Sequence, residues 1–200
     1  LPPRALRAHI DRAKNQGLDP PAALAASQTP REREAAELYA SYAQRLTAFN
    51  AVDFDDLIAM PVRVLETDAE TRAKWQRKFR YLLVDEYQDT NDAQYRLMRL
   101  LAGDRGMFTA VGDDDQSIYA WRGANPENLA QLGQDYPKLK IVKLEQNYRC
   151  AQRILRAANA VIGQNPHLHP KKLWSALPDG DQIRIIARSS DADEAEFVAA

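Results

Sequence analysis

The 200-residue chain contains one cysteine, Cys150, so it cannot form an internal disulfide bond, which fits the reducing environment of the cytoplasm. It has no apolar run long enough to span a bilayer and no recognisable signal peptide, which argues against a membrane protein. Its three histidines and Cys150 do not have the spacing of zinc ligands. A net charge of −1 gives no indication of a nucleic acid partner. We therefore expect a cytoplasmic globular protein without a membrane partner.

The charged residues are unevenly distributed along the chain. Acidic residues predominate between Asp85 and Asp115, whereas basic residues predominate between Lys138 and Lys172. An acidic segment followed by a basic one is compatible with a metal site beside a surface that binds phosphates. Taken alone, this uneven distribution of charge is better explained by two ordinary solvated surfaces. Other features of the sequence have to decide between the two interpretations.

Helical patterns fill the first quarter of the chain. A helical stretch near residues 4–16 is followed by Gly17, an expected helix end. A second helix is expected to begin after Thr29, which forms a capping box with Glu32 around a proline at the first helical position. Apolar residues then recur at helical spacing, at Ala35, Leu38, Tyr39, Tyr42, Leu46 and Phe49. The N-terminal part is therefore predicted to be all helical.

Another helix is expected to start at a capping box formed by Thr67 and Glu70 and to run towards Lys78. Beyond it, strand candidates alternate with helical patterns, and the first two candidates are short apolar runs typical of buried parallel strands. The predicted strands are residues 81–84, 107–111, 140–144 and 182–187. One predicted helix contains residues 95–101, and another begins at residues 125–126. Two more are predicted over residues 151–163 and 191–200. This alternation predicts an α/β fold with a mostly parallel sheet.

Two adjacent carboxylates, Asp85 and Glu86, follow the first predicted strand directly. Ligands of open α/β sheets bind beyond the carboxyl ends of the strands. At such a place Asp85 can hold Mg²⁺, which prefers oxygen ligands, and Glu86 can orient and deprotonate a water that attacks a γ-phosphate. The alternative is that both residues only cap the following helix, because an apolar run followed by Asp-Glu is common.

Four short segments carry a resemblance to a known family. They are DFDDL at residues 53–57, DEYQDT at residues 85–90, GDDDQSIYAWRGA at residues 112–124 and QNYR at residues 146–149. In order and spacing they are similar to segments of the Rep/UvrD-type superfamily 1 DNA helicases, in which the last three resemble the second, third and fourth motifs. The resemblance extends from about residue 30 to the end of the chain, and the region of residues 165–167 and the tail of the chain are most similar to the Rep branch.

The resemblance implies a RecA-like architecture, in which a parallel sheet is flanked by helices and joined to an all-helical N-terminal part. Residues 1–50 would form the end of the helical insertion of the first motor domain. Residues 51–137 would form part of the first RecA-like motor domain, and residues 138–200 would form the start of the second.

The resemblance also assigns roles at an ATP site that uses Mg²⁺. Glu86 would be the catalytic base, and Asp85 and Glu86 would be the metal ligands. Gln116 would sense the γ-phosphate through its amide, and Tyr148 would stack on the adenine. Arg149 would reach the γ-phosphate from the second motor domain as an arginine finger, a role suited to a planar, permanently charged guanidinium. In isolation, Gln116 and Arg149 would be interpreted as a structural amide and a helix-capping cation.

The segment that resembles the third motif, residues 112–124, is predicted to bind DNA. Tyr119 and Trp121 can stack on the bases of single-stranded DNA whatever its sequence, a contact worth about 1–3 kcal/mol per base. Arg122 can hold a phosphate or brace the rings. An isolated aromatic pair is more often part of a core, but the neighbouring arginine and the motif reverse that expectation. Because Gln116 lies close to Trp121 in the chain, loss of the γ-phosphate can be transmitted to the DNA-binding rings.

The implied activity is that of an ATP-dependent helicase that translocates 3′ to 5′ on single-stranded DNA, unwinds duplexes and junctions, and works with replication or repair proteins. The Walker A loop, Gly-x-x-x-x-Gly-Lys-Ser/Thr, and the last two family motifs are absent from these residues, so we expect a segment of a longer protein with little or no activity alone. Two alternatives stay open. One is the helicase subunit of a repair nuclease, and the other is a non-hydrolysing single-strand-binding module, against which the intact ATP-site residues argue.

Overall fold

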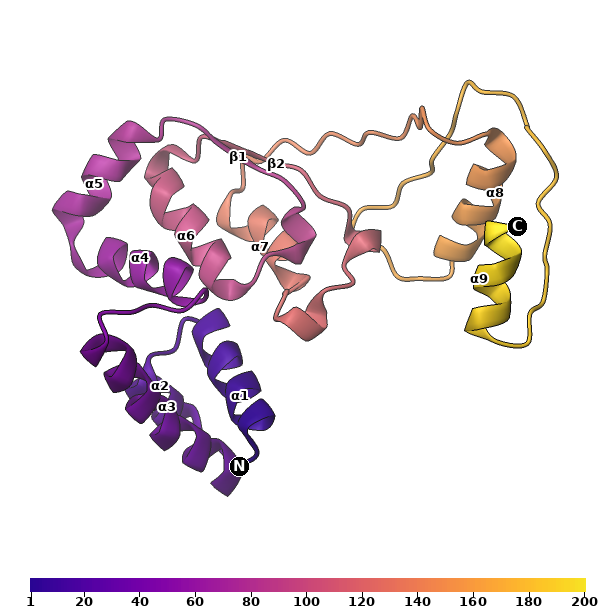
Figure 1. Cartoon of the computed structure of the whole chain (residues 1–200). Coiled ribbons are helices and arrows are strands. Elements are labelled where there is room, and N and C mark those ends of the chain that lie inside the picture. Colours follow the sequence, from indigo (N-terminus) through magenta and orange to yellow (C-terminus); the bar gives the residue numbers. More distant parts are fainter. The chain divides into compact units, whose positions relative to one another are not determined.

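The computed structural model describes the backbone of residues 1–200 and every side chain except that of Arg122. The chain divides into two compact units, Leu1–Leu139 and Lys140–Ala200. Figure 1 shows that both strands belong to the first unit and that helices make up most of the remaining regular structure. Among the described residues, no helix combines the length and the apolar character that crossing a membrane requires.

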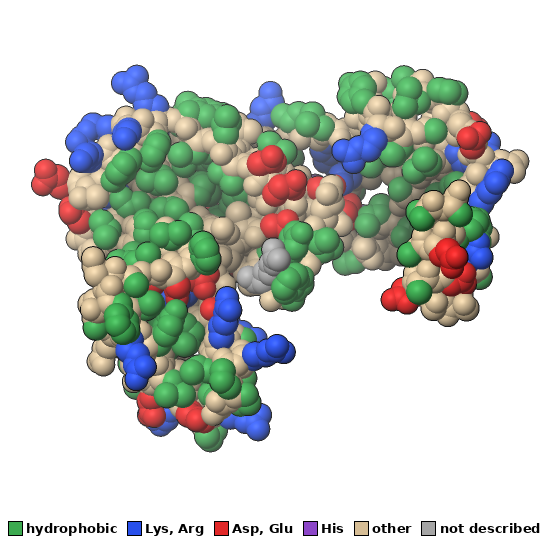
Figure 2. All heavy atoms as spheres, in the orientation of Figure 1, with side chains coloured by type: hydrophobic (Ala, Val, Ile, Leu, Met, Phe, Trp, Pro, Cys, Tyr) green, Lys and Arg blue, Asp and Glu red, His purple; other side chains and the backbone are tan. Residues whose placement is uncertain are grey.

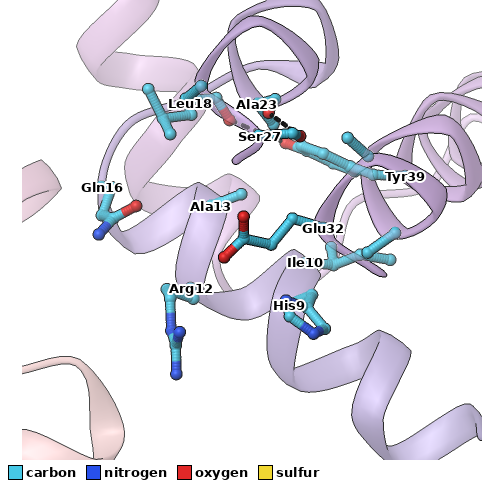
Figure 3. A pocket seen from close by; sticks show the side chains of 13 residues that line it. His9, Ile10, Arg12, Ala13, Gln16, Leu18, Ala23, Ser27, Glu32 and Tyr39 are labelled. Carbon is cyan, nitrogen blue, oxygen red and sulfur yellow. Dashed lines mark hydrogen bonds between the residues drawn. The ribbon is translucent and has the colours of Figure 1, made fainter. Parts of the chain in front are cut away.

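Three helices make up the N-terminal part: α1 (Pro3–Asn15), α2 (Pro20–Ala26) and α3 (Pro30–Ala48). Figure 1 shows the three helices next to one another. They pack around a small core that contains Ile10 and Tyr39. The predicted capping box is confirmed, because Thr29 accepts the Glu32 N–H at 3.2 Å and Glu32 accepts the Thr29 N–H at 3.0 Å. A cavity of about 120 Å³ remains between the helices, with Ile10 and Tyr39 in its lining (Figure 3). The all-helical prediction for this part is confirmed.

Two further helices, α4 (Asp56–Thr67) and α5 (Ala69–Lys78), precede the sheet. The capping box predicted at residues 67–70 is wrong, because Thr67 is the last residue of α4 and its hydroxyl donates to a carbonyl oxygen one turn back at 2.8 Å. Asp68 begins α5 instead, and its carboxylate accepts an N–H of the first turn at 3.0 Å. Aspartate is at least as good a helix cap as threonine, so the neighbouring residue takes the role.

The sheet contains two parallel strands, β1 (Leu82–Val84) and β2 (Phe108–Ala110), which pair along their whole length. They confirm the first two of the predicted strands. Helix α6 (Asp92–Ala102) lies between them in the chain, as Figure 1 shows. Because parallel strands end at the same edge of a sheet, the segments that follow β1 and β2 are brought together there.

A buried core holds α6 against the sheet. Tyr87 and Tyr95 lie in this core, and Leu132 of α7 (Glu127–Asp135) closes it. The Tyr95 hydroxyl donates to Asp135 of α7, and burial together with this hydrogen bond raises the pKa of Tyr95. Tyr87 is fully buried directly after the Asp85-Glu86 pair. The core therefore fixes the start of the segment that follows β1.

The second unit contains two predicted helices, α8 (Gln152–Ile162) and α9 (Asp191–Ala199). The strands predicted at residues 140–144 and 182–187 are wrong, because the described backbone of neither segment pairs with another strand. The pairing described in this unit is an isolated parallel bridge between Gln146 and Trp174. Apolar and β-branched residues favour extended backbone, but a strand also needs a neighbouring backbone to bond to. The observed fold is mixed and mainly helical, with a small parallel sheet.

Candidate functional site

Asp85 and Glu86 follow β1 directly, and both are exposed. Glu86 has a left-handed backbone, with φ 48° and ψ 46°. A residue other than glycine in a sparsely populated region costs on the order of 1–3 kcal/mol, and such residues cluster at functional sites. The Asp85 carboxylate accepts the Glu86 N–H at 2.9 Å, which helps to hold the bend. Both carboxylates therefore lie where the sequence placed them, at the carboxyl end of β1.

Gln88 connects the segments that follow the two strands, and its side chain is only 2% exposed. Its amide nitrogen donates to a Glu86 carboxylate oxygen at 2.9 Å, and its amide oxygen accepts the Asp113 N–H at 3.0 Å. The backbones also meet here, since the Tyr87 N–H donates to the Val111 carbonyl oxygen at 2.9 Å. Sequence reasoning gave Gln88 no role of its own, although its place inside the DEYQDT segment was a signal that could have indicated one.

Gly112 allows these segments to approach closely. A Cβ at this position would lie 2.9 Å from the amide oxygen of Gln88 and 3.3 Å from its backbone nitrogen, so a larger residue would push the segments apart. A few residues further on, the Gln116 amide donates to the Asp113 carboxylate at 2.8 Å. Gln116 is therefore connected through Asp113 to Gln88, and from there to the carboxylate of Glu86.

The exposed acidic groups at this edge suit a divalent cation. Asp85 and Glu86 offer carboxylate oxygens, the ligand type that Mg²⁺ prefers. Figure 2 shows acidic side chains gathered on the first unit, close to where Figure 1 places the two strands. The side chain of Gln116 is exposed as well. The arrangement can therefore accept a metal-bound phosphate and present a carboxylate and an amide to it.

The predicted DNA-binding residues lie on one turn of the first unit. Trp121 is 75% exposed and Tyr119 is 38% exposed, and their ring centroids lie 6.2 Å apart with the planes tilted by 47°. The rings are thus at the surface, as stacking on a base requires, and not in a core. The side chain of Arg122 lies outside the described residues, so its predicted role stays a prediction. Gly123 ends the turn with a φ of +91°, which glycine adopts without strain.

This turn is attached to the segment after β1 on both sides. Before the turn, the Ser117 hydroxyl donates to the Gln88 carbonyl oxygen at 3.4 Å. After it, the Thr90 carbonyl oxygen accepts the Asn125 N–H at 2.9 Å and the side-chain amide of Asn128 at 3.0 Å. Asn128 is 5% exposed, so its hydrogen bonds are shielded from water. The aromatic rings and the Glu86 carboxylate therefore belong to one hydrogen-bonded framework.

The QNYR segment forms a turn in the second unit. The side-chain oxygen of Asn147 accepts the N–H groups of Arg149 and the following residue, at 3.0 and 2.7 Å. Tyr148 is 79% exposed on this turn, and Arg149 is exposed beside it. Both predicted ATP-binding side chains of this unit are therefore accessible to a ligand. Because they belong to a different unit from Glu86, their convergence on one triphosphate stays a prediction.

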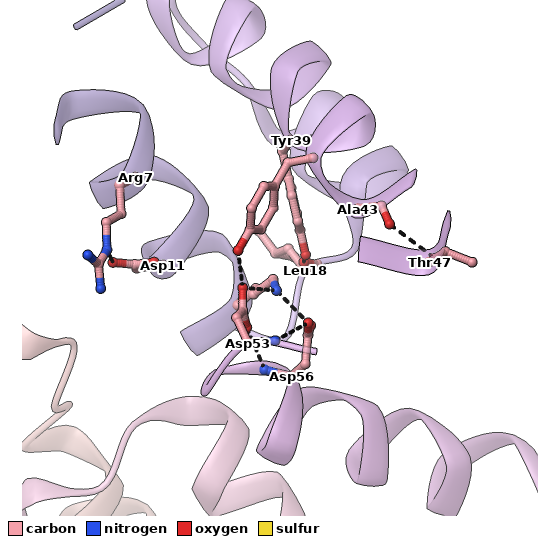
Figure 4. Close-up of polar contacts among 10 residues, drawn as sticks. Arg7, Asp11, Leu18, Tyr39, Ala43, Thr47, Asp53 and Asp56 are labelled. Carbon is pink, nitrogen blue, oxygen red and sulfur yellow. Dashed lines mark hydrogen bonds and ion pairs between the residues drawn. The ribbon is translucent and has the colours of Figure 1, made fainter. Parts of the chain in front are cut away.

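The DFDDL segment holds a buried ion cluster. Lys14 of α1 is 2% exposed and donates to Asp53 and to Asp56 at 2.6 Å each, and Figure 4 shows the two carboxylates together. The Tyr42 hydroxyl also donates to Asp53, at 2.9 Å. Burial acts to raise the pKa of Asp53, but the hydrogen bonds from Lys14, the Asp56 N–H and Tyr42 hold it below its ordinary value. The segment thus joins the N-terminal helices to α4, a role that the sequence did not indicate.

Comparison with known proteins gives matches over both units. Residues 1–137 match the UvrD/REP helicase N-terminal domain, and residues 142–200 match the UvrD-like helicase C-terminal domain. The chain is 51% identical to the ATP-dependent DNA helicase Rep of Escherichia coli (strain K12) over 189 residues, which are 94% of this chain and 28% of that protein. It is 45% identical to the ATP-dependent DNA helicase PcrA of Leuconostoc citreum over 196 residues, which are 98% of this chain and 26% of that protein.

A third relative shows a similar degree of identity. Rep of Buchnera aphidicola subsp. Acyrthosiphon pisum (strain APS) is 46% identical over 185 residues, which are 92% of this chain and 29% of that protein. The chain therefore spans less than a third of the length of these relatives. Since the N-terminal family match alone covers residues 1–137, which is more than half of the sequence, the chain belongs to the UvrD/Rep helicase family.

Proposed function

We propose that this chain is part of an ATP-dependent DNA helicase that translocates 3′ to 5′ along single-stranded DNA and unwinds duplexes. The names of the relatives, ATP-dependent DNA helicase Rep and PcrA, support this proposal. The observation that carries it is the hydrogen-bonded path from Glu86 through Gln88 to the segment that contains Trp121. An enzyme that couples hydrolysis to movement on DNA needs such a connection. We place its work in the cytoplasm, in replication or repair.

In this proposal the first unit supplies the groups that act on the attacking water. Glu86 orients the water and takes its proton, and Asp85 and Glu86 would hold Mg²⁺. When bound there, Mg²⁺ would supply positive charge near the phosphate oxygens. The amide nitrogen of Gln116 has two N–H groups, so it can donate one to the γ-phosphate while it keeps Asp113 as the partner of the other.

The second unit would complete the ATP site. Tyr148 stacks on the adenine, and its high exposure leaves its ring face available for this contact. Arg149 donates to the γ-phosphate, where a permanently charged, planar guanidinium stabilises negative charge. ATP bound between the units would draw them together, and hydrolysis would release them.

The DNA contacts are assigned to the turn of the third motif. Trp121 is the main stacking residue, Tyr119 supports it, and Arg122 holds a phosphate or braces the rings. The exposure of Trp121 and its short distance from the Tyr119 ring support this assignment. Stacking is insensitive to sequence because every base has a π-face, which suits an enzyme that moves along any strand.

We also propose the domain organisation that the family resemblance implies. Residues 1–50 are the end of a helical insertion, residues 51–137 are part of the first RecA-like motor domain, and residues 138–200 begin the second. The limits of the two family matches, 1–137 and 142–200, support the second boundary. The parallel pairing of β1 with β2 supports a RecA-like sheet in the first motor domain.

The variant Glu86→Gln in the complete protein tests this proposal. The change keeps the size of the side chain and removes its basicity, so DNA-stimulated ATP hydrolysis should fall by roughly 10²–10⁴-fold while ATP binding persists. Unwinding of a duplex with a 3′ single-stranded tail should be lost with it. The exposed Glu127→Gln on α7 is the matched control and should behave as the wild type.

The wild-type protein should unwind the 3′-tailed duplex and leave a 5′-tailed duplex intact. The isolated 200 residues should hydrolyse little or no ATP. If Glu86→Gln hydrolysed ATP at the wild-type rate, Glu86 would not be the catalytic base. DNA binding by the complete wild-type protein without any hydrolysis would instead favour a non-hydrolysing single-strand-binding module.

A further inference from the structure

We infer that Asn15, the last residue of α1, is a positioning residue for the turn that carries Trp121. This inference rests on the proposed function and deepens it, because it gives the N-terminal helices a part in base stacking. Asn15 lies outside all four family-like segments, so no motif assigns it a role. Two contacts of its side chain and the firm anchoring of α1 give Asn15 this role.

The first contact joins Asn15 to the segment that follows β1. The side-chain amide of Asn91 donates to the side-chain oxygen of Asn15 at 2.7 Å. Asn91 is also the cap of α6, where its side-chain oxygen accepts the Gln94 N–H at 2.8 Å. Both ends of the Asn91 amide are therefore engaged, which fixes its orientation and holds Asn15 against the first turn of α6.

The second contact joins Asn15 to the turn that carries Tyr119 and Trp121, which is the proposed DNA-binding turn. A Cβ at Gly123 would lie 3.1 Å from the side-chain nitrogen of Asn15 and 3.4 Å from its Cβ. Gly123 accommodates Asn15 at this distance because it has no side chain, and its φ of +91° closes the turn. Asn15 thus packs directly against the turn whose exposed ring is Trp121.

The end of α1 is a firm support for these contacts. The neighbouring residue, Lys14, is buried and donates to both Asp53 and Asp56 at 2.6 Å. Rotation or sliding of α1 would separate this buried charge from its partners, which is strongly unfavourable. Asn15 is therefore presented to Gly123 from a fixed position.

A groove runs between α1 and the DNA-binding turn. Its volume is about 1360 Å³, and Asn15, Gly123 and Trp121 all contribute to its lining. The position of the turn decides where the Trp121 ring stands at this groove. Loss of the Asn15 contacts should therefore change how a base stacks, whereas the Glu86 carboxylate keeps its own hydrogen bond to Gln88.

The test compares three variants of the complete protein. Asn15→Leu removes the hydrogen bond at similar side-chain volume, and Asn15→Asp keeps an oxygen acceptor for Asn91. Gln16→Leu is the matched control, because Gln16 is exposed, lines the same groove and undergoes the same amide-to-leucine change. Each variant is titrated with oligothymidylate that contains one 2-aminopurine, whose fluorescence reports base stacking. ATP hydrolysis is measured against the concentration of unlabelled oligothymidylate.

Asn15→Leu should raise the DNA concentration that half-saturates ATP hydrolysis by about three- to tenfold, the effect expected for one hydrogen bond. It should also reduce the change in 2-aminopurine fluorescence on binding, while the maximal rate at saturating DNA is retained. Asn15→Asp should return half-saturation towards the wild-type value. Gln16→Leu should match the wild type in both measurements.

Equal effects of Asn15→Leu and Gln16→Leu would overturn the inference, and so would a loss of maximal rate with unchanged half-saturation. If Asn15→Leu does not fold, Asn91→Ser removes the same hydrogen bond while serine still caps α6, and the same shift is expected. Trp121→Ala separates this inference from the proposed function. An unchanged 2-aminopurine signal in that variant contradicts the proposed stacking. If Trp121→Ala loses the 2-aminopurine signal but Asn15→Leu has a normal half-saturating DNA concentration, the role of Asn15 is contradicted and the proposed stacking by Trp121 stands.

Discussion

The side-chain amide of Gln88 donates to a Glu86 carboxylate oxygen across 2.9 Å, while its oxygen accepts the Asp113 N–H at 3.0 Å. Because Gln88 is buried, water competes little for its amide at the hydrogen bond to Asp113. The position of the Glu86 carboxylate after β1 thus depends on the backbone after β2. A ligand that moves either segment must affect the other.

Gln88→Leu should break this connection. It removes both hydrogen bonds and leaves the Asp113 N–H without its partner, which should lower the free energy of unfolding by about 1–3 kcal/mol. In the complete protein the kcat of DNA-stimulated ATP hydrolysis should fall on the order of 100-fold, because Glu86, the proposed base, loses its alignment. Urea unfolding and steady-state kinetics measure the two effects. The exposed Gln134→Leu on α7 is the control, and a normal kcat in folded Gln88→Leu would contradict the prediction.

Gln116→Ala should uncouple hydrolysis from unwinding. The Gln116 amide donates to Asp113 at 2.8 Å, and the same segment continues to Trp121. In the proposed mechanism the amide therefore reports the γ-phosphate to the ring that stacks on DNA. The variant should hydrolyse ATP in the presence of DNA but unwind fewer base pairs for each ATP consumed. Simultaneous measurement of phosphate release and strand separation gives this ratio. A wild-type ratio would show that the signal does not pass through Gln116.

Signals that depend on neighbouring residues were readable from the sequence. The capping box of Thr29 and Glu32 is confirmed because it depends on residues three positions apart. The box at Thr67 failed because Asp68, the next residue, competes for the same role. Helix α4 was not predicted, and its interior contains Pro61, a residue that usually ends a helix. Local patterns thus predict a helix well only where a single residue can cap it and the apolar residues follow one helical periodicity.

Contacts between distant residues explain what the sequence could not indicate. The segment 140–144 contains two β-branched residues, Ile141 and Val142, but Val142 is 65% exposed and no described backbone pairs with the segment as a strand. Gln88 reaches Asp113 across 25 residues, and Asn91 reaches Asn15 across 76. No periodicity or short motif encodes such pairs. The sequence predicted the chemical groups at the strand ends, whereas the side chains that connect them emerge only from the fold.

Lys14→Met should destabilise the first unit strongly. Methionine has a similar length but no charge, so Asp53 and Asp56 would be left partly buried without their cation. Breaking a buried ion pair by removing one partner lowers the free energy of unfolding by about 3–5 kcal/mol. Urea unfolding of the chain measures this loss. Arg7→Met is the control, because Arg7 pairs with Asp11 at the surface, and its unfolding midpoint should not move.

A stability of the Lys14 variant equal to the wild type would mean that the cluster does not hold α1. Combining Lys14→Met with Asp53→Asn and Asp56→Asn should recover part of the loss, because the unpaired carboxylates are then neutral. This recovery distinguishes an electrostatic cause from a packing defect, which the additional substitutions would not repair.

Tyr42 should make the stability of the first unit sensitive to alkaline pH. Burial, and then the hydrogen bond to Asp53, raises the pKa of Tyr42 from 10.0 to about 12. Since the folded pKa lies above the unfolded one, the contribution of the protonated hydroxyl is fully present below pH 10.0 and is lost as the pH rises towards about 12. Tyr42→Phe lacks this group, so its stability should fall less steeply across that interval. Urea unfolding at several pH values compares the two proteins, and parallel curves would show that the Tyr42 hydroxyl is not held by Asp53.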